Sequence, residues 1–208
     1  MNPELLRIKL TTLITKYIPS ATVPVVVNWI VDYKIVLTIT EKRNSLLGDY
    51  RHPYGKDGHR ISVNGDLNQY AFLITFIHEM AHLLTWEKYK GHVKAHGGEW
   101  KMIFGFLLKD FFDKNIFPEQ LIVPLKRYVS DPSASTCNDP HLMKALRQFD
   151  TRINSLLEEL QKDDLFKTHD GRVFKKGERV RVRYKCLEVK SNRMYLFHPA
   201  HEVKKVGE

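Results

Sequence analysis

Cysteine is scarce in this chain, which has only Cys137 and Cys186 and no C-x-x-C pair. A structural zinc site built on four cysteines is therefore excluded. A mixed metal site remains an alternative, because Cys137 and His141 are four residues apart. Its other ligands would be Cys186 and one of His198 and His201. Two reduced cysteines in a cytoplasmic protein are the simpler interpretation.

The chain also lacks a convincing membrane span or secretory leader. The apolar run from Leu67 to Trp86 is long enough to cross a bilayer, but it is interrupted by ionisable and amide side chains. These are Asn68, His78, Glu79 and His82. In residues 1–18, basic residues are interleaved with apolar ones and no cleavage site follows. We expect an amphipathic helix there, capped by Asn2 with Pro3 in its first turn, in a cytoplasmic protein with no membrane partner.

Acidic residues are outnumbered, with 24 Asp and Glu against 33 Lys and Arg, which gives a formal net charge of +9. Such an excess favours contact with phosphate groups that does not depend on sequence. The 208 residues, 43% of them hydrophobic, are enough for one domain with a real core and a small appendage.

The most informative motif is HEMAH at residues 78–82. On a helix, His78 and His82 lie one above the other and can bind a single metal ion. Glu79 lies on the adjacent side, where it can accept a proton from a water on that metal. No Pro or Gly occurs from Leu67 to Lys90, which favours a buried helix. Without a metal, burial of these three polar side chains would cost roughly 1–3 kcal/mol each.

A catalytic zinc usually has three protein ligands, so one more donor is expected nearby. We predict His96, because Gly91 ends the helix and Gly97 lets the chain bend before the next one. Glu99 is the alternative third ligand, since some zinc peptidases use a glutamate from the following helix. His92 would need a tighter return of the chain, and we expect it either at the surface or beside the metal ligands without binding the metal.

Four segments together carry a family resemblance: LGDYR at 47–51, ISVN at 61–64, HEMAH at 78–82 and HGGEW at 96–100. They resemble the SprT-like zinc metallopeptidases, which include the Spartan proteases, over roughly residues 1–130. The resemblance implies Zn²⁺ as cofactor and hydrolysis of peptide bonds. For Spartan-type members it also implies digestion of proteins bound to DNA. Many bacterial relatives carry a zinc ribbon of cysteine pairs that this chain lacks.

Within this resemblance, His78, His82 and His96 are the implied metal ligands and Glu79 is the implied catalytic base. A second group that stabilises negative charge is expected in such a site. Tyr50, Tyr54 and Tyr89 are candidates, although each of these three side chains could simply be a packing residue.

The remaining pattern predicts an α+β fold of zincin-like type, with helices packed on a small antiparallel sheet. The strands are expected at Lys34–Thr40, Leu46–Arg51 and His59–Asn64. Further helices are expected from Glu99 to about Asp113 and from Pro118 to Val129. The segment from Pro24 to Asp32 cannot be assigned from sequence. The predicted domains are 1–130 for the peptidase, 131–162 for a linker and helix, and 163–208 for a small basic β module.

The linker is Ser130–Thr136, and its helix starts with Asp139 as cap and runs to Gln161. In the β module, turns are expected at Asp170–Gly171 and Ser191–Asn192. Four basic residues alternate along what we predict to be one strand, next to aromatic Tyr184, Tyr195 and Phe197. These basic residues are Arg179, Arg181, Arg183 and Lys185. We predict that they contact nucleic acid, the alternative being a solvated strand face.

These observations predict a zinc-dependent metalloendopeptidase that associates with DNA and cleaves DNA-bound or crosslinked proteins with broad specificity. One alternative is a non-catalytic, zinc-stabilised adaptor that binds nucleic acid. Glu79 argues against it, because a structural zinc site does not need that base. Another alternative is a metal-dependent hydrolase with a different amide or ester substrate.

Overall fold

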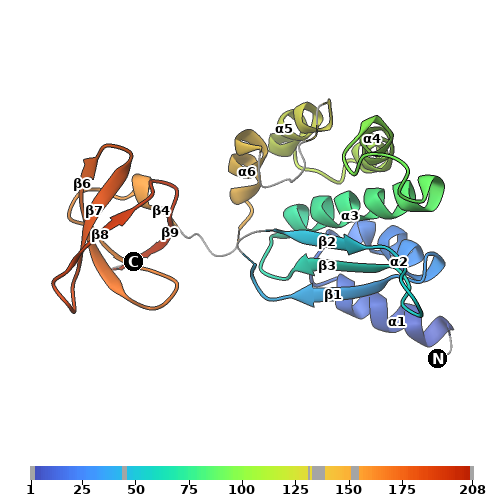
Figure 1. Ribbon diagram of the computed structural model, residues 1–208, viewed down its shortest axis with the longest axis horizontal. Coiled ribbons are helices and arrows are strands. Elements are labelled where there is room, and N and C mark those ends of the chain that lie inside the picture. Colours follow the sequence, from blue (N-terminus) through green and yellow to red (C-terminus); the bar gives the residue numbers. More distant parts are fainter. Residues whose placement is uncertain (1–2, 44–45, 131, 133–138, 151–154, 207–208) are drawn as a thin grey trace. The chain divides into compact units, whose positions relative to one another are not determined.

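The computed structural model describes residues 3–43, 46–130, 132, 139–150 and 155–206. The chain divides into two compact units, Met1–Asp150 and Thr151–Glu208 (Figure 1). The described residues form six α-helices and two sheets, so the predicted α+β class is confirmed. The finer zincin-like assignment stays a prediction. None of the described helices combines the length and apolar character that a bilayer crossing requires.

The first unit contains all of the α-helices and a three-stranded sheet. Its elements in chain order are α1 (Pro3–Ile14), α2 (Val23–Asp32), β1 (Val36–Thr40), β2 (Gly48–Arg51), β3 (Arg60–Asn64), α3 (Gln69–Tyr89), α4 (Gly98–Asp113), α5 (Glu119–Ser130) and α6 (Pro140–Arg147). The predicted helices and strands of residues 1–130 are confirmed within a few residues at each end. The segment that sequence could not assign is α2. Asn2, the predicted cap of α1, lies outside the described residues.

The first sheet is mixed, with β3 in the centre and the order β1-β3-β2. β2 pairs antiparallel with β3, but β1 pairs parallel with it. The prediction of an antiparallel sheet was therefore wrong for β1. Successive strands do reverse direction, but because β3 inserts between β1 and β2, its two neighbours run in opposite senses. Alternation of polar and apolar residues reports which face is buried and carries no information about this order.

Helix α3 forms the centre of the first core and packs against β2 and β3 (Figure 1). The Asn68 side chain caps it by accepting hydrogen bonds from the backbone N–H groups of Tyr70 and Ala71. The helix ends at Lys90, which adopts a left-handed conformation. Buried side chains occur on nearly every side of α3 itself, including those of the fully buried Phe72 and Phe76. Such a helix is stable only when other elements cover it.

Helix α6 belongs to the first unit and is shorter than predicted. Asp139 caps it as expected, accepting from the backbone N–H of Leu142 at 2.7 Å. It ends at Arg147 rather than Gln161. At this end, the Asn68 side-chain amide donates a hydrogen bond to the backbone carbonyl of Leu146 at 2.9 Å, which attaches α6 to the start of α3. The division at residue 150 differs from the predicted boundaries at 130 and 162. Cys137, and with it most of the predicted linker, lies outside the described residues.

The second unit is a six-stranded antiparallel sheet with the order β4-β9-β5-β6-β7-β8. Its strands are β4 (Ser155–Leu156), β5 (Leu165–Lys167), β6 (Val173–Val180), β7 (Arg183–Glu188), β8 (Met194–Phe197) and β9 (Glu202–Lys205). The prediction of a small antiparallel β module is confirmed. Its core contains Phe166, Phe174 and the free thiol of Cys186.

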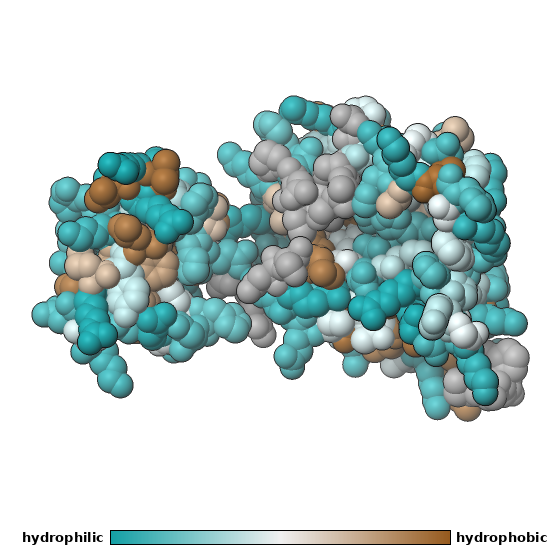
Figure 2. Space-filling view, viewed as in Figure 1, coloured by the Kyte–Doolittle hydropathy of each residue, from teal (hydrophilic) through white to brown (hydrophobic). Residues whose placement is uncertain are grey.

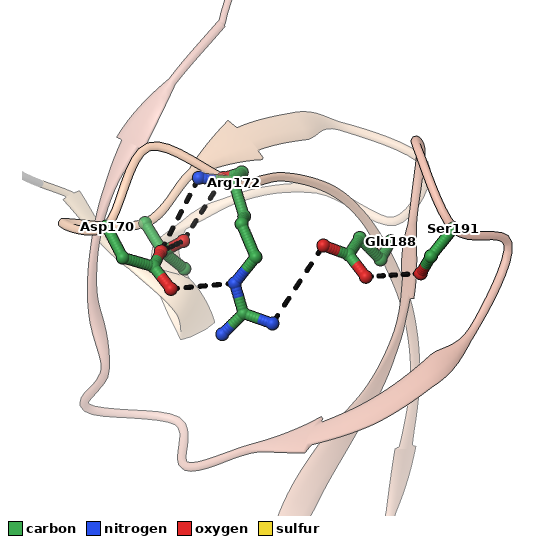
Figure 3. A network of polar contacts seen from close by, with 5 residues as sticks. Asp170, Arg172, Glu188 and Ser191 are labelled. Carbon is green, nitrogen blue, oxygen red and sulfur yellow. Dashed lines mark hydrogen bonds and ion pairs between the residues drawn. The ribbon is translucent and has the colours of Figure 1, made fainter.

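Both turns predicted for this module are joined by one polar network (Figure 3). Arg172 contacts Asp170 at 2.7 Å and Glu188 at 3.9 Å, and the Ser191 hydroxyl donates to Glu188. A hydrogen bond from the Thr168 hydroxyl, followed by that from Arg172, lowers the pKa of Asp170 to about 2. The guanidinium of Arg172 therefore bridges the Asp170–Gly171 turn to the Ser191–Asn192 turn.

Candidate metal centre and active site

Helix α3 brings the two histidines of HEMAH together, as the four-residue spacing predicts. The Nε2 atoms of His78 and His82 are 3.3 Å apart. The Nε2 atom of His96 is also 3.3 Å from that of His78. The three residues form a group whose ligand atoms all lie within 4.8 Å of one another, and no other such group occurs among the described residues.

His96 reaches this cluster from the loop between α3 and α4. Gly91 has a φ of +85°, which lets the chain turn back after α3. His96 then lies two residues before Gly98, the first residue of α4. The alternative ligand Glu99 is in the first turn of α4 and is not part of the cluster, and His92 is exposed as expected.

The distances between the histidine nitrogens fit a tetrahedral zinc ion. Zinc–nitrogen bonds of about 2.0–2.1 Å at the tetrahedral angle separate two ligand nitrogens by about 3.3–3.4 Å. The distances from His78 Nε2 to the other two Nε2 atoms agree with this value.

The protonation state of the three imidazoles also fits a zinc ligand. Burial, and then the proximity of the other rings, lowers the pKa of His78 and of His82 to about 3. Burial lowers the pKa of His96 as well. The rings are therefore neutral near pH 7, which is the form that binds a metal.

Glu79 is buried beside the cluster, with 6% of its surface exposed. Burial, assisted by the charge of Asp49, raises its pKa to about 8. Arg43 and a hydrogen bond from the backbone N–H of Tyr50 oppose that shift. A carboxyl group with this pKa is mostly protonated at pH 7 in the metal-free site, and a cation bound beside it would favour the ionised form that can accept a proton.

Comparison with known proteins gives a family match over the segment that contains this site. Residues 35–111 match the family model described as the SprT-like family. The chain is thus similar to the SprT-like family over this segment. The match runs from the start of the sheet into α4 and contains the three histidines and Glu79. No curated protein and no solved structure is similar enough to the chain to count as a match.

Gly48 lies in the SprT-like segment at a close contact with Glu79 that sequence reasoning did not identify. A Cβ atom at this position would lie 2.7 Å from Glu79 Oε1 and 2.7 Å from Thr75 Cγ2. β2 can therefore approach α3 this closely only because residue 48 has no side chain. Its place in the LGDYR motif was the available signal, but the clash partner is 31 residues away in sequence.

Trp100 was also missed, although it is the last residue of HGGEW. Its ring centroid lies 4.6 Å from that of His78, 5.2 Å from that of His82 and 4.8 Å from that of His96. The indole is fully buried and stacks on Phe104. Trp100 therefore restricts the orientation of all three imidazoles.

Of the three candidate tyrosines, Tyr50 lines the pocket around the histidines. Its hydroxyl is 2.9 Å from His59 Nδ1, and His59 Nε2 is 3.1 Å from Glu87 Oε1. Burial and the nearby Glu87 raise the pKa of Tyr50, which keeps the hydroxyl protonated. Tyr54 is 79% exposed, and neither Tyr54 nor Tyr89 is a lining residue of this pocket.

The pocket of the SprT-like segment has a volume of about 410 Å³. Three parts of the first unit form its walls: strand β2, helix α3 and the loop that leads to His96. The histidines and Glu79 are accessible from it, so a substrate that enters the pocket meets both the metal ligands and the base.

In the β module, the predicted basic strand is in fact a hairpin. β6 ends at Val180 and β7 begins at Arg183, so Arg179 and Arg183 lie on different strands. Arg181 lies in the connecting turn with a φ of +56°. The prediction of one strand was wrong because polar and apolar residues keep alternating through the turn, which contains no Gly, Asn or Asp to mark it.

The four basic side chains predicted to contact nucleic acid are nevertheless exposed, including Lys185 on β7. The aromatic residues predicted beside them have a structural role. Tyr184, Tyr195 and Phe197 pack against the core of the module and are only partly exposed. Figure 2 shows mostly hydrophilic residues on the visible face of this module, with hydrophobic ones between them. The structure therefore offers a basic surface at the hairpin without a free stacking platform.

Proposed function

We propose that this chain is a zinc-dependent endopeptidase of the HExxH type that cleaves proteins associated with DNA. One observation carries the proposal: three neutral imidazoles converge in a pocket that also contains a buried carboxylate with a raised pKa. His78, His82 and His96 would hold the zinc ion, and Glu79 would be the base.

Zinc, when bound, lowers the pKa of its water towards neutrality and polarises the substrate carbonyl. Glu79 accepts the proton of the attacking water, and the backbone N–H of Tyr50 holds the carboxylate in place. Glu79 then transfers that proton to the nitrogen of the leaving amine. Trp100 keeps the imidazoles in one orientation throughout.

The position of β2 supports a peptide as the substrate. β2 is an edge strand of its sheet, and Gly48, Asp49 and Tyr50 on it line the pocket. The outer side of an edge strand has backbone N–H and C=O groups that do not pair within the sheet. An extended peptide that pairs with such an edge is held by backbone hydrogen bonds that most sequences can form.

We predict that Gly48→Ala lowers kcat for cleavage of an unfolded protein while zinc content stays near wild type. Thermal stability should fall as well, because the methyl group meets the buried side chains of Thr75 and Glu79. The added methyl group displaces the Glu79 carboxylate, and a misplacement of about 1 Å at a reacting group costs on the order of 100-fold. Gly58→Ala is the control, since a Cβ at Gly58 is 3.6 Å from its nearest neighbour, an ordinary contact. Equal kcat in the two variants would show that Gly48 has no part in placing the base.

Association with DNA is proposed for the second unit, where basic residues outnumber acidic ones. Several of its lysines are paired with acidic groups, such as Lys162 with Glu178 and Lys175 with Asp163. Within the described residues, the ion pairs do not include the four basic residues at the tip of the β6–β7 hairpin, which are Arg179, Arg181, Arg183 and Lys185. Unpaired, exposed cations are available to phosphate groups at little desolvation cost.

We predict that the triple change Arg179→Ala, Arg181→Ala and Arg183→Ala lowers affinity for DNA of arbitrary sequence about tenfold or more. The dependence of log Kd on log salt should also become shallower, by up to about 0.9 for each phosphate group that the variant no longer neutralises. Fluorescence anisotropy at several salt concentrations measures both quantities. A matched triple change at three exposed lysines outside the hairpin removes the same charge. These lysines are Lys167, Lys190 and Lys204. An equal decrease of affinity in the two triple variants would contradict a hairpin site.

A further inference from the structure

The pocket around the three histidines has two chemically different walls. Where β2 faces the HEMAH turn of α3, the pocket carries the carboxyl groups of Asp49 and Glu79. The other wall carries no ionisable side chain. It consists of Thr85, Trp86, Gly91, Val93 and Ala95. A charged group placed against this wall would lose water without gaining a partner, whereas an apolar group would gain from burial.

Trp86 is fixed in this wall before any ligand binds. The ring of His52 stacks on it with centroids 3.9 Å apart and planes 10° apart. On another side, a Cβ atom at Gly91 would lie 2.8 Å from Trp86 Cζ3, so the loop passes directly beside the indole. A side chain that is already ordered loses little entropy on binding, which makes the wall a preformed surface.

The apolar wall adjoins the metal centre at both of its ends. Trp86 follows His82 by four residues on α3, so the two side chains lie on the same face of the helix. Ala95 directly precedes His96. A substrate whose carbonyl lies at the histidines therefore places a neighbouring side chain against this wall.

We propose that this wall is a subsite for one apolar side chain of Leu, Met or Phe type, next to the peptide bond that is cut. The inference rests on the proposed peptidase function and narrows its substrate class. Backbone pairing with β2 does not depend on the side chains of the peptide. The apolar wall would therefore favour particular residues at only one position of the substrate.

The test uses zinc-loaded full-length protein and quenched fluorescent peptides that differ at one residue on either side of the cleaved bond. On one side, Leu, Met or Phe should give a kcat/KM about 10–100-fold above that of Asp. Val93→Asp should remove most of this preference and favour Lys. Val123→Asp is the control, because Val123 is 75% exposed on α5 and is not a lining residue of the pocket.

A binding measurement separates this inference from the proposed function. A Leu-containing peptide added to Glu79→Gln should change tryptophan fluorescence, and a second change, Trp86→Phe, should remove that signal. Binding without any cleavage by wild type would contradict the peptidase function and support the subsite. Cleavage at equal rates for all peptides, or an equal decrease for all of them in Val93→Asp, would overturn the subsite and leave the peptidase function standing.

Discussion

Replacing Glu79 with glutamine leaves zinc in the protein and lowers kcat for protein cleavage by about 10²–10⁴-fold. The amide has nearly the same shape as the carboxylate, so the buried position beside the histidines is still filled. It can no longer accept a proton from water or deliver one to the leaving amine. KM should change little, because β2 and the pocket wall are intact.

The matched control is Glu99→Gln, which makes the same chemical change in the first turn of α4 and outside the histidine cluster. This variant should keep its zinc and most of its activity. The measurement is the initial rate of cleavage of an unfolded protein at equal zinc content. A cleavage rate of Glu79→Gln within a few-fold of wild type would show that Glu79 is not the catalytic base.

His96→Ala should lose zinc. Removal of a residue that only supports a ligand costs 10–100-fold in metal affinity, so removal of one of three ligands should cost more than about 100-fold. Zinc content after dialysis against a weak chelator, measured by mass spectrometry, should be one per chain in wild type and near zero in the variant. Cleavage activity should disappear with the metal.

Two further variants decide whether His96 is the third ligand. His92→Ala alters a histidine in the same loop that is exposed and outside the cluster, so zinc should stay bound. Glu99→Ala tests the alternative donor and should also keep zinc. Zinc retained in His96→Ala and absent from Glu99→Ala would reverse the assignment of the third ligand.

Much of the candidate site could be predicted from local sequence. The spacing of His78 and His82 on an uninterrupted apolar helix fixes which face they share. The glycines around His96 indicate a turn between two helices, and the structure places His96 there. The positions of these residues could be predicted because the interacting residues are close in sequence or lie on one regular element.

The parts that sequence did not predict depend on contacts between distant elements. The requirement for glycine at position 48 arises from the approach of β2 to Glu79 on α3. The parallel pairing of β1 arises from the insertion of β3 into the middle of the sheet. Arg181 lies in a turn and has a left-handed backbone, a conformation that arginine rarely adopts. The residue type therefore gave no sign of the turn. In each case the local pattern was compatible with more than one tertiary arrangement.

The most direct test of the central claim is cleavage of an unfolded protein by metal-stripped enzyme to which zinc is added back. The account predicts no cleavage after chelation, recovery as zinc approaches one per chain, and no recovery in Glu79→Gln. Full activity in metal-free protein would contradict it, as would a well-folded, zinc-loaded wild type that cuts no protein.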